Sequence, residues 1–195
     1  MVLIKSVTAK SILDSRKEKT IEVSINTNVG KFSASAPNGK SKGKYEAKSY
    51  KKSLEEDIKT IKEFSEYFSN DIIEKFDDLK RIEDIVSGHL GANTVFAFES
   101  AILKSVAKEQ KKEVWELVNP SAKKSPRLVG NCIGGGKHSQ ADKKPDFQEF
   151  LLIPDKKTVK ECFEINKKLK DSLGIDLKEI DEKFDGKKND EEAWV

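Results

Sequence analysis

The sequence predicts an α+β fold over about its first 120 residues, followed by the start of a second segment with strands and a helix. Residues 2–36 alternate apolar and polar side chains, as half-buried strands do, and residues 50–118 place apolar side chains at helical spacing. Residues 128–153 contain two short apolar runs bounded by glycine and proline. Strands that precede a series of helices are typical of an α+β domain.

The composition is that of a soluble globular protein with a heavily charged surface. Apolar and charged residues each make up 36% of the 195 residues, yet the net charge is only +3. Because lysines alternate with acidic residues along the same segments, we expect no dedicated nucleic-acid site. No apolar run reaches the roughly 20 residues of a membrane span, and no signal-peptide core is present, so we expect a cytoplasmic protein without membrane contact. Cys132 and Cys162 have neither metal nor disulfide spacing, which predicts reduced thiols.

The first strands predict a three-stranded antiparallel meander. Apolar and polar residues alternate over 21–25, a turn follows at 28–30, and the alternation resumes over 31–34. An earlier strand over 3–8 completes the meander. The polar stretch 37–45 that comes next predicts a loop.

Helices and a linker are expected after that loop. Apolar spacing predicts helices over 50–68, 72–82, 93–106 and 114–118. The polar, proline-bounded stretch 119–126 is the best candidate for a linker, and it divides the chain into domains at 1–120 and 127–195.

Beyond the linker, strands are expected over 128–133 and 147–153, with a helix over 158–173. The turn between the strands contains three glycines, and the second strand carries Gln148 and Glu149 in apolar company. A carboxylate in such a run is costly to bury without a partner. Its position therefore indicates either a functional role or a strand end that faces water.

Motifs along the whole chain resemble, in order, those of the enolase (phosphopyruvate hydratase) family. They are Ser-Ile-Leu-Asp-Ser-Arg at 11–16 with Thr-Ile-Glu-Val at 20–23, Pro-Asn-Gly-Lys-Ser-Lys-Gly at 37–43, Leu-Gly-Ala-Asn at 90–93, Asn-Cys-Ile-Gly-Gly-Gly-Lys-His at 131–138 with Gln-Glu-Phe-Leu-Leu-Ile-Pro at 148–154, and Asn-Asp-Glu-Glu-Ala-Trp at 189–194. The resemblance implies an enolase-like α+β cap, made of the meander and helices, followed by the incomplete start of a TIM-like α/β barrel. A whole enolase is about twice as long.

By resemblance, the activity is the reversible dehydration of 2-phosphoglycerate to phosphoenolpyruvate in glycolysis and gluconeogenesis, a hydro-lyase reaction. Enolases are a known example of a lysine or histidine base that works with one or two magnesium ions. The magnesium carboxylates and the catalytic lysine have no counterpart in this chain, so we expect it to be inactive alone and to bind Mg²⁺ weakly. The expected partners are the substrate and product, a complementary C-terminal barrel chain and, as in the family, a second copy in a homodimer.

The resemblance also implies the site residues. Glu191 takes the place of the proton donor that helps hydroxide leave, and Glu149 is the second acid of that pair. Gln148 would hydrogen-bond the substrate, and His138 would close toward the substrate phosphate as a further catalytic group. Ser41 would approach from the mobile loop to contact the substrate and the second magnesium ion.

The chain also departs from the family pattern. The segment 17–19 is Lys-Glu-Lys where the family has Gly-Asn-Pro, lysines flank Ser41, and Glu192-Ala193 replaces a glycine pair. That replacement is costly if the backbone there needs a positive φ. The loss of the glycine pair favours one alternative, a non-catalytic enolase-like interaction protein. A second alternative, a surface-binding module that uses its lysines, is disfavoured by the even charge balance.

Overall fold

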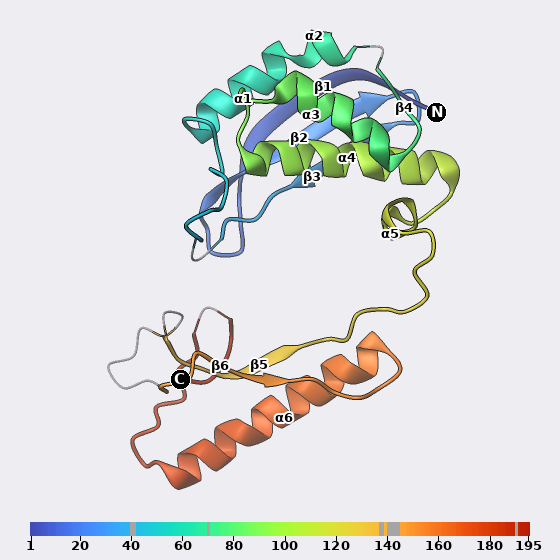
Figure 1. Cartoon of the computed structure of the whole chain (residues 1–195). Helices are drawn as coiled ribbons and strands as arrows, with labels where there is room; N and C mark the ends of the chain where they lie inside the picture. Colours follow the sequence, from blue (N-terminus) through green and yellow to red (C-terminus); the bar gives the residue numbers. More distant parts are fainter. Residues whose placement is uncertain (40–41, 70, 137–138, 140–144, 190) are drawn as a thin grey trace. The chain divides into compact units, whose positions relative to one another are not determined.

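The computed structural model describes residues 1–39, 42–69, 71–136, 139, 145–189 and 191–195. The chain divides into two compact units, Met1–Ala122 and Lys123–Val195 (Figure 1). Each unit has its own sheet and helices, and each is described by itself below. Within the described ranges, no helix is long and apolar enough to cross a lipid bilayer.

The first unit is built on an antiparallel sheet of four strands in the order β3-β2-β1-β4. The strands are β1 (Val2–Leu13), β2 (Lys19–Thr27), β3 (Lys31–Ser35) and β4 (Ile72–Ile73). The spacing of buried residues along β1 changes from two to three between Ile4 and Val7, because the register with β2 shifts between Ile4 and Ser6. The irregularity keeps the buried side chains of both strands on one face.

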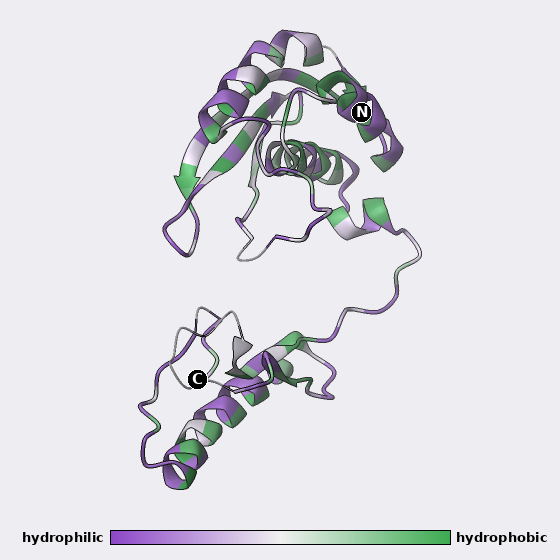
Figure 2. Cartoon of the chain, turned by 60° about the vertical axis from the view of Figure 1, so that its left-hand side comes forward, coloured by the Kyte–Doolittle hydropathy of each residue, from purple (hydrophilic) through white to green (hydrophobic). Residues whose placement is uncertain are grey.

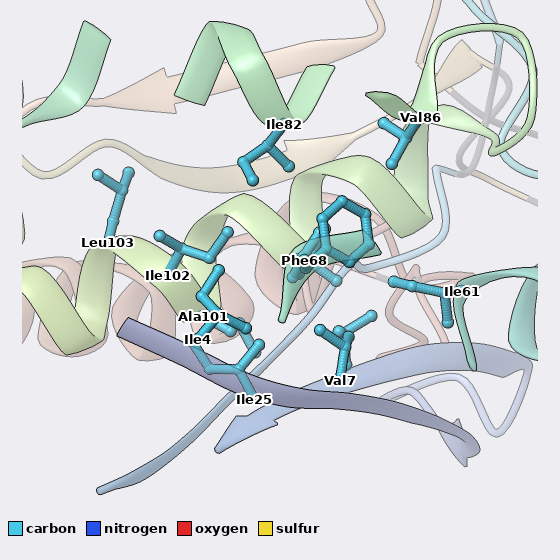
Figure 3. Close-up of a cluster of buried hydrophobic side chains, with 14 of the residues drawn as sticks. Ile4, Val7, Ile25, Ile61, Phe68, Ile82, Val86, Ala101, Ile102 and Leu103 are labelled. Atoms are coloured by element: carbon cyan, nitrogen blue, oxygen red, sulfur yellow. The ribbon is translucent and has the colours of Figure 1, made fainter. Parts of the chain in front are cut away.

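Helices cover this face of the sheet. They are α1 (Leu54–Glu63), α2 (Ser65–Phe68), the 3-10 turn η1 (Phe76–Asp78), α3 (Leu79–Val86), α4 (Ala92–Gln110) and α5 (Val114–Val118). Figure 3 shows Ile4, Val7 and Ile25 of the sheet facing Ile102 and Phe68 of the helices. All five side chains are almost fully buried, and together they form the centre of a continuous core.

The region expected as one helix over 72–82 is different in the structure, so that expectation is wrong at its start. Ile72 and Ile73 form β4, and Ile73 pairs with Val2 of β1. Asp78 then accepts hydrogen bonds from the backbone N–H groups of Glu74 (2.9 Å) and Lys75 (3.2 Å), which turns the chain before α3 begins. The expected three-stranded meander therefore has a fourth strand at its edge.

The first predicted helix begins later than expected and is divided. Ser53 caps α1 by accepting a hydrogen bond from the Glu56 N–H at 3.1 Å, so the helix starts at Leu54 and not at residue 50. The chain then turns at Phe64, which separates α1 from α2.

The second unit contains a two-stranded antiparallel sheet and one long helix. The elements are β5 (Gly130–Gly134), β6 (Glu149–Leu152) and α6 (Val159–Ile180). Thr158 and Glu161 form a capping box at the start of α6, as expected for a helix from 158. The helix continues past the predicted end at 173, and the ring of Trp194 lies 2.6 Å from where a Cβ on Gly174 would be. Gly174 therefore leaves space for Trp194 and does not end the helix.

The two units differ in how much apolar surface they bury. In the described residues of the second unit, the buried apolar side chains are the small ones of Cys132, Pro154, Cys162 and Ala193. No residue of β6 is buried, and Figure 2 shows hydrophobic stretches along α6. The exposed large apolar side chains of this unit include Phe147, Phe150, Leu151, Ile153, Val159, Phe163, Leu169, Ile175 and Ile180.

Candidate functional site

The glycine turn after β5 forms a tight contact with the start of β6. The Gly135 N–H donates to the Gln148 carbonyl at 2.8 Å. A Cβ on Gly135 would lie 2.3 Å from the Pro145 carbonyl oxygen, so a side chain at this position would collide with the backbone. Glu149 follows at the first position of β6, exposed and opposite Gly134. The turn therefore fixes the backbone that carries Gln148 and Glu149.

Glu191 lies in a second turn, which is attached to β5. The Trp194 N–H donates to the Cys132 carbonyl at 3.0 Å, and the Trp194 carbonyl accepts from the Gly134 N–H at 2.8 Å. Asn131 Nδ2 donates a hydrogen bond of 2.8 Å to Glu191 Oε2. The strand β5 thus holds both the backbone and the carboxylate of the Glu191 turn.

Glu192 occupies the left-handed region, with φ of 63°. A residue with a Cβ is strained there, and glycine is not. The neighbouring Ala193 is fully buried, and its Cβ lies 3.3 Å from where a Cβ on Gly134 would be. The first residue of the replaced glycine pair therefore carries the backbone strain, whereas the second packs against β5.

Glu149 and Glu191 reach β5 at different positions. Glu149 is opposite Gly134. Glu191 instead accepts a hydrogen bond from Asn131, and the cross-strand partner of Asn131 is Leu151. Glu191 opens onto a cavity of about 450 Å³ between β5 and α6, and Glu149 is not among the described residues that line it. Between the described side chains, no hydrogen bond joins the two carboxylates.

Ser41 and His138 lie outside the described residues. The start of the loop that contains Ser41 is held by the β1–β2 turn: Arg16 Nη2 donates to the Asn38 carbonyl at 2.6 Å, and Asn38 Nδ2 donates to the Lys19 carbonyl at 3.0 Å. In that turn Lys17 has φ of 62°. Lys17 stands where the family pattern has glycine, so this lysine adopts a conformation that glycine reaches without strain.

Comparisons with known proteins decide the family. The model of the enolase N-terminal domain matches residues 4–118. The chain belongs to the enolase family. It is 31% identical to the enolase of Methanothermobacter thermautotrophicus over 202 aligned positions, which cover 99% of this chain and 48% of the relative. It is 28% identical to the enolase of Methanosphaera stadtmanae, with 99% and 49% covered.

These matches confirm the predicted resemblance and the enolase N-terminal domain. The chain spans about half the length of the curated enolases that it matches. The four-stranded sheet and helices of the first unit are thus the fold of the matched domain in this chain.

The described residues do not by themselves form the magnesium site that enolases need. Among them, no group of three or more His, Cys, Asp or Glu side chains is arranged to hold a metal ion. Magnesium requires several oxygen ligands in octahedral geometry, and Glu149 and Glu191 are separate, exposed carboxylates.

The enolase domain contains one buried acid that sequence reasoning missed. Asp57 of α1 is completely buried and accepts hydrogen bonds from the Gly91 N–H (2.8 Å), the Thr94 hydroxyl (2.6 Å) and the Lys51 N–H (3.0 Å). It thereby caps the start of α4 from a neighbouring helix. The signal in the sequence was its place on the apolar stripe of α1, one helical turn before Ile61.

Glu99 of α4 is a second acid that the sequence did not single out. Burial, together with the charge and hydrogen bonding of Glu83 on α3, raises the pKa of its carboxyl group to about 7. One oxygen of Glu99 is buried without a hydrogen-bond partner among the described residues. The α3–α4 contact therefore contains a pair of carboxyl groups that resists full ionisation at neutral pH.

Proposed function

We propose that this chain is the N-terminal portion of an enolase-type hydro-lyase, which interconverts 2-phosphoglycerate and phosphoenolpyruvate in the cytoplasm. The observation that carries the proposal is the attachment of the Glu191 turn to β5, within a chain that aligns with enolases over 99% of its length. The turn brings an exposed carboxylate to a cavity of about 450 Å³, and a concave site of this size is where small ligands commonly bind.

The proposed reaction is an elimination in which this chain supplies acids and substrate contacts. A base removes the proton next to the substrate carboxylate, and the electron pair left behind forms the double bond. The hydroxyl group on the neighbouring carbon then leaves, and the Glu191 carboxyl group gives it a proton, so that water is released. Glu149 is the second acid of the pair, and Gln148 hydrogen-bonds the substrate. His138 would approach the phosphate, and Ser41 would contact the second magnesium ion from its loop.

The base and the main magnesium ligands belong to a part of enolase that these residues do not include. When bound, magnesium stabilises the negative charge that develops on the substrate carboxylate. Because the described residues form no such site, we expect this chain alone to hold Mg²⁺ weakly and to show no turnover.

The expected domain over 127–195 lies within the second unit, Lys123–Val195, and its elements support the proposal that it is the beginning of the barrel domain. After β5 and β6 the chain passes through α6 and returns to β5, where Trp194 forms a parallel bridge with Ile133. The connection from β5 to this parallel neighbour contains a helix, as parallel connections in α/β barrels do, and it also contains the antiparallel strand β6. The exposed apolar side chains of β6 and α6 are the surface that the remaining strands and helices of a barrel would cover. The proposed partners are thus a complementary barrel half and, as in the family, a second copy in a homodimer.

Mixing this chain with the missing half of an enolase tests the proposal. Formation of phosphoenolpyruvate is followed by a coupled absorbance assay with this chain alone, and with this chain plus a polypeptide that covers the unmatched half of a relative. Activity that requires both polypeptides supports the enolase proposal. Stable association without activity would instead support the non-catalytic interaction protein, which the strained Glu192 backbone favours.

A further inference from the structure

The backbone of Glu191 is fixed by its own turn. Asn189 Oδ1 accepts hydrogen bonds from the N–H groups of Glu191 (2.9 Å) and Ala193 (3.0 Å), and the Asn189 N–H donates to the Ala193 carbonyl at 2.9 Å. Trp194 attaches the turn to β5 on both sides of Ile133. The Glu191 side chain itself is exposed and has several rotatable bonds, so the turn alone does not determine where its carboxylate points.

Asn131 supplies a contact to this carboxylate from β5. Its Nδ2 lies 2.8 Å from Glu191 Oε2, although the residues are 60 positions apart in the sequence. Asn131 sits where the register between β5 and β6 shifts, before the pair of Ile133 with Phe150. Such an irregularity redirects side chains relative to a regular strand. Here Asn131 and its neighbour Cys132 line the same cavity as Glu191.

The surroundings fix which end of the Asn131 amide faces Glu191. A carboxylate only accepts hydrogen bonds, so the amide must present Nδ2 to it and turn Oδ1 away. Asn131 Oδ1 is buried and has no partner among the residues that the structure describes. The amide of Asn166 on α6 packs against the preceding residue, 2.5 Å from where a Cβ on Gly130 would lie, and lines the same cavity as Asn131. The Asn131 side chain is thus half-buried, with Oδ1 turned inward and Nδ2 turned outward to an exposed hydrogen bond with Glu191.

We infer that Asn131 is a positioning residue, which holds the Glu191 carboxylate in the orientation needed to protonate the leaving hydroxyl group. The inference rests on the proposed function, because it gives Asn131 a role only through Glu191. Asn131 touches no substrate in this scheme. Loss of a contact that orients a catalytic group typically costs about 10–100-fold in activity.

A double-mutant cycle separates this role from a structural one. The enzyme is assembled from the full chain and the unmatched half of a relative, and kcat and KM are measured for wild type, Asn131→Ala, Glu191→Gln and the double variant. Asn119→Ala is the matched control, because Asn119 is exposed and, within the contacts that the structure describes, its side chain hydrogen-bonds to Ser121 alone. A side-chain amide NMR spectrum of the chain alone, with Glu191→Gln and Glu192→Gln, tests the contact itself.

Asn131→Ala should lower kcat about 10–100-fold with KM changed less than about threefold, and it should have no further effect in the Glu191→Gln background. The Asn131 amide signal should shift with Glu191→Gln and not with Glu192→Gln. An equal loss of kcat in both backgrounds, no loss at all, or an unmoved amide signal would overturn the inference. If assembled wild type is inactive, the proposed function fails and the inference fails with it. If wild type is active and the cycle is additive, only the inference fails.

Discussion

Replacing Asp57 should destabilise the first unit strongly, because three donors converge on one buried carboxylate. Two are backbone N–H groups, of Gly91 and Lys51, and the third is the Thr94 hydroxyl. In Asp57→Ala both N–H groups lose this acceptor, the Gly91 N–H in a buried environment and the Lys51 N–H in a partly buried one. Leaving each such group without its partner costs about 1–3 kcal/mol, and the negative charge at the start of α4 is worth a further 0.3–1 kcal/mol or so.

We therefore expect Asp57→Ala to lower the free energy of unfolding by about 3–5 kcal/mol. Asp57→Asn keeps one carbonyl oxygen but turns an NH₂ group toward a donor, so its loss should be smaller, about 2–3 kcal/mol. Asp84→Asn is the matched control. Asp84 is exposed on α3, and its replacement should change the stability by less than about 0.5 kcal/mol.

The assay is urea unfolding of the full chain, followed by hydrogen exchange of the α4 amides, which reports the first unit separately from the second. The amides at the start of α4 should lose protection first, because Asp57 contacts Gly91 and Thr94 there. A loss below about 1 kcal/mol for Asp57→Ala, or a loss equal to that of Asp84→Asn, would refute the view that this carboxylate holds α4 in place.

Two further predictions concern the backbone strain at Glu192 and the pH dependence of stability. Glu192→Gly should stabilise the second unit by about 0.5–1 kcal/mol in urea unfolding, because the left-handed conformation is costly for a residue with a Cβ. The control is Glu182→Gly, which should instead destabilise the unit because Glu182 does not have a positive φ. Equal effects of the two substitutions would contradict the reasoning. The pKa of Glu99 is raised from 4.5 to about 7 in the folded state, so unfolding releases a proton between these values and stability falls as the pH rises through this window. Glu99→Gln should therefore be more stable than wild type at pH 8 by about 1 kcal/mol, a value that is reduced because water reaches part of the side chain. The difference in stability should disappear below about pH 4. Parallel pH profiles of stability for wild type and Glu99→Gln would contradict this prediction.

The sequence predicts the first unit well where local pattern and burial agree. Ile21, Val23 and Ile25 alternate with polar residues, and all are fully buried on one face of β2. Ile72 and Ile73 were assigned wrongly because their apolar spacing continues into α3, and only pairing with β1, far away in the sequence, makes them a strand. Asp57 was missed because its donors come from segments that the chain brings together only on folding.

The candidate site is less predictable for the same reason. The motif around Glu149 placed it beside a glycine turn, and the positions of Gly135 and Gln148 follow from backbone contacts between neighbouring strands. The bond from Asn131 to Glu191 depends on the register shift in β5 and on how the chain returns after α6. Neither the register shift nor the return of the chain is visible in a local sequence pattern. The roles of Glu149, Gln148, Glu191, Ser41 and His138 stay predictions.

The most direct test is the rate of phosphoenolpyruvate formation by Glu191→Gln, measured in the enzyme assembled from this chain and the unmatched half of a relative. Glu192→Gln is the control, because it changes the same charge on the adjacent residue. If Glu191 is the proton donor, kcat should fall about 10²–10⁴-fold in Glu191→Gln and stay within about twofold of wild type in the control. Equal rates for wild type and Glu191→Gln, or no product from the assembled wild type, would contradict the account.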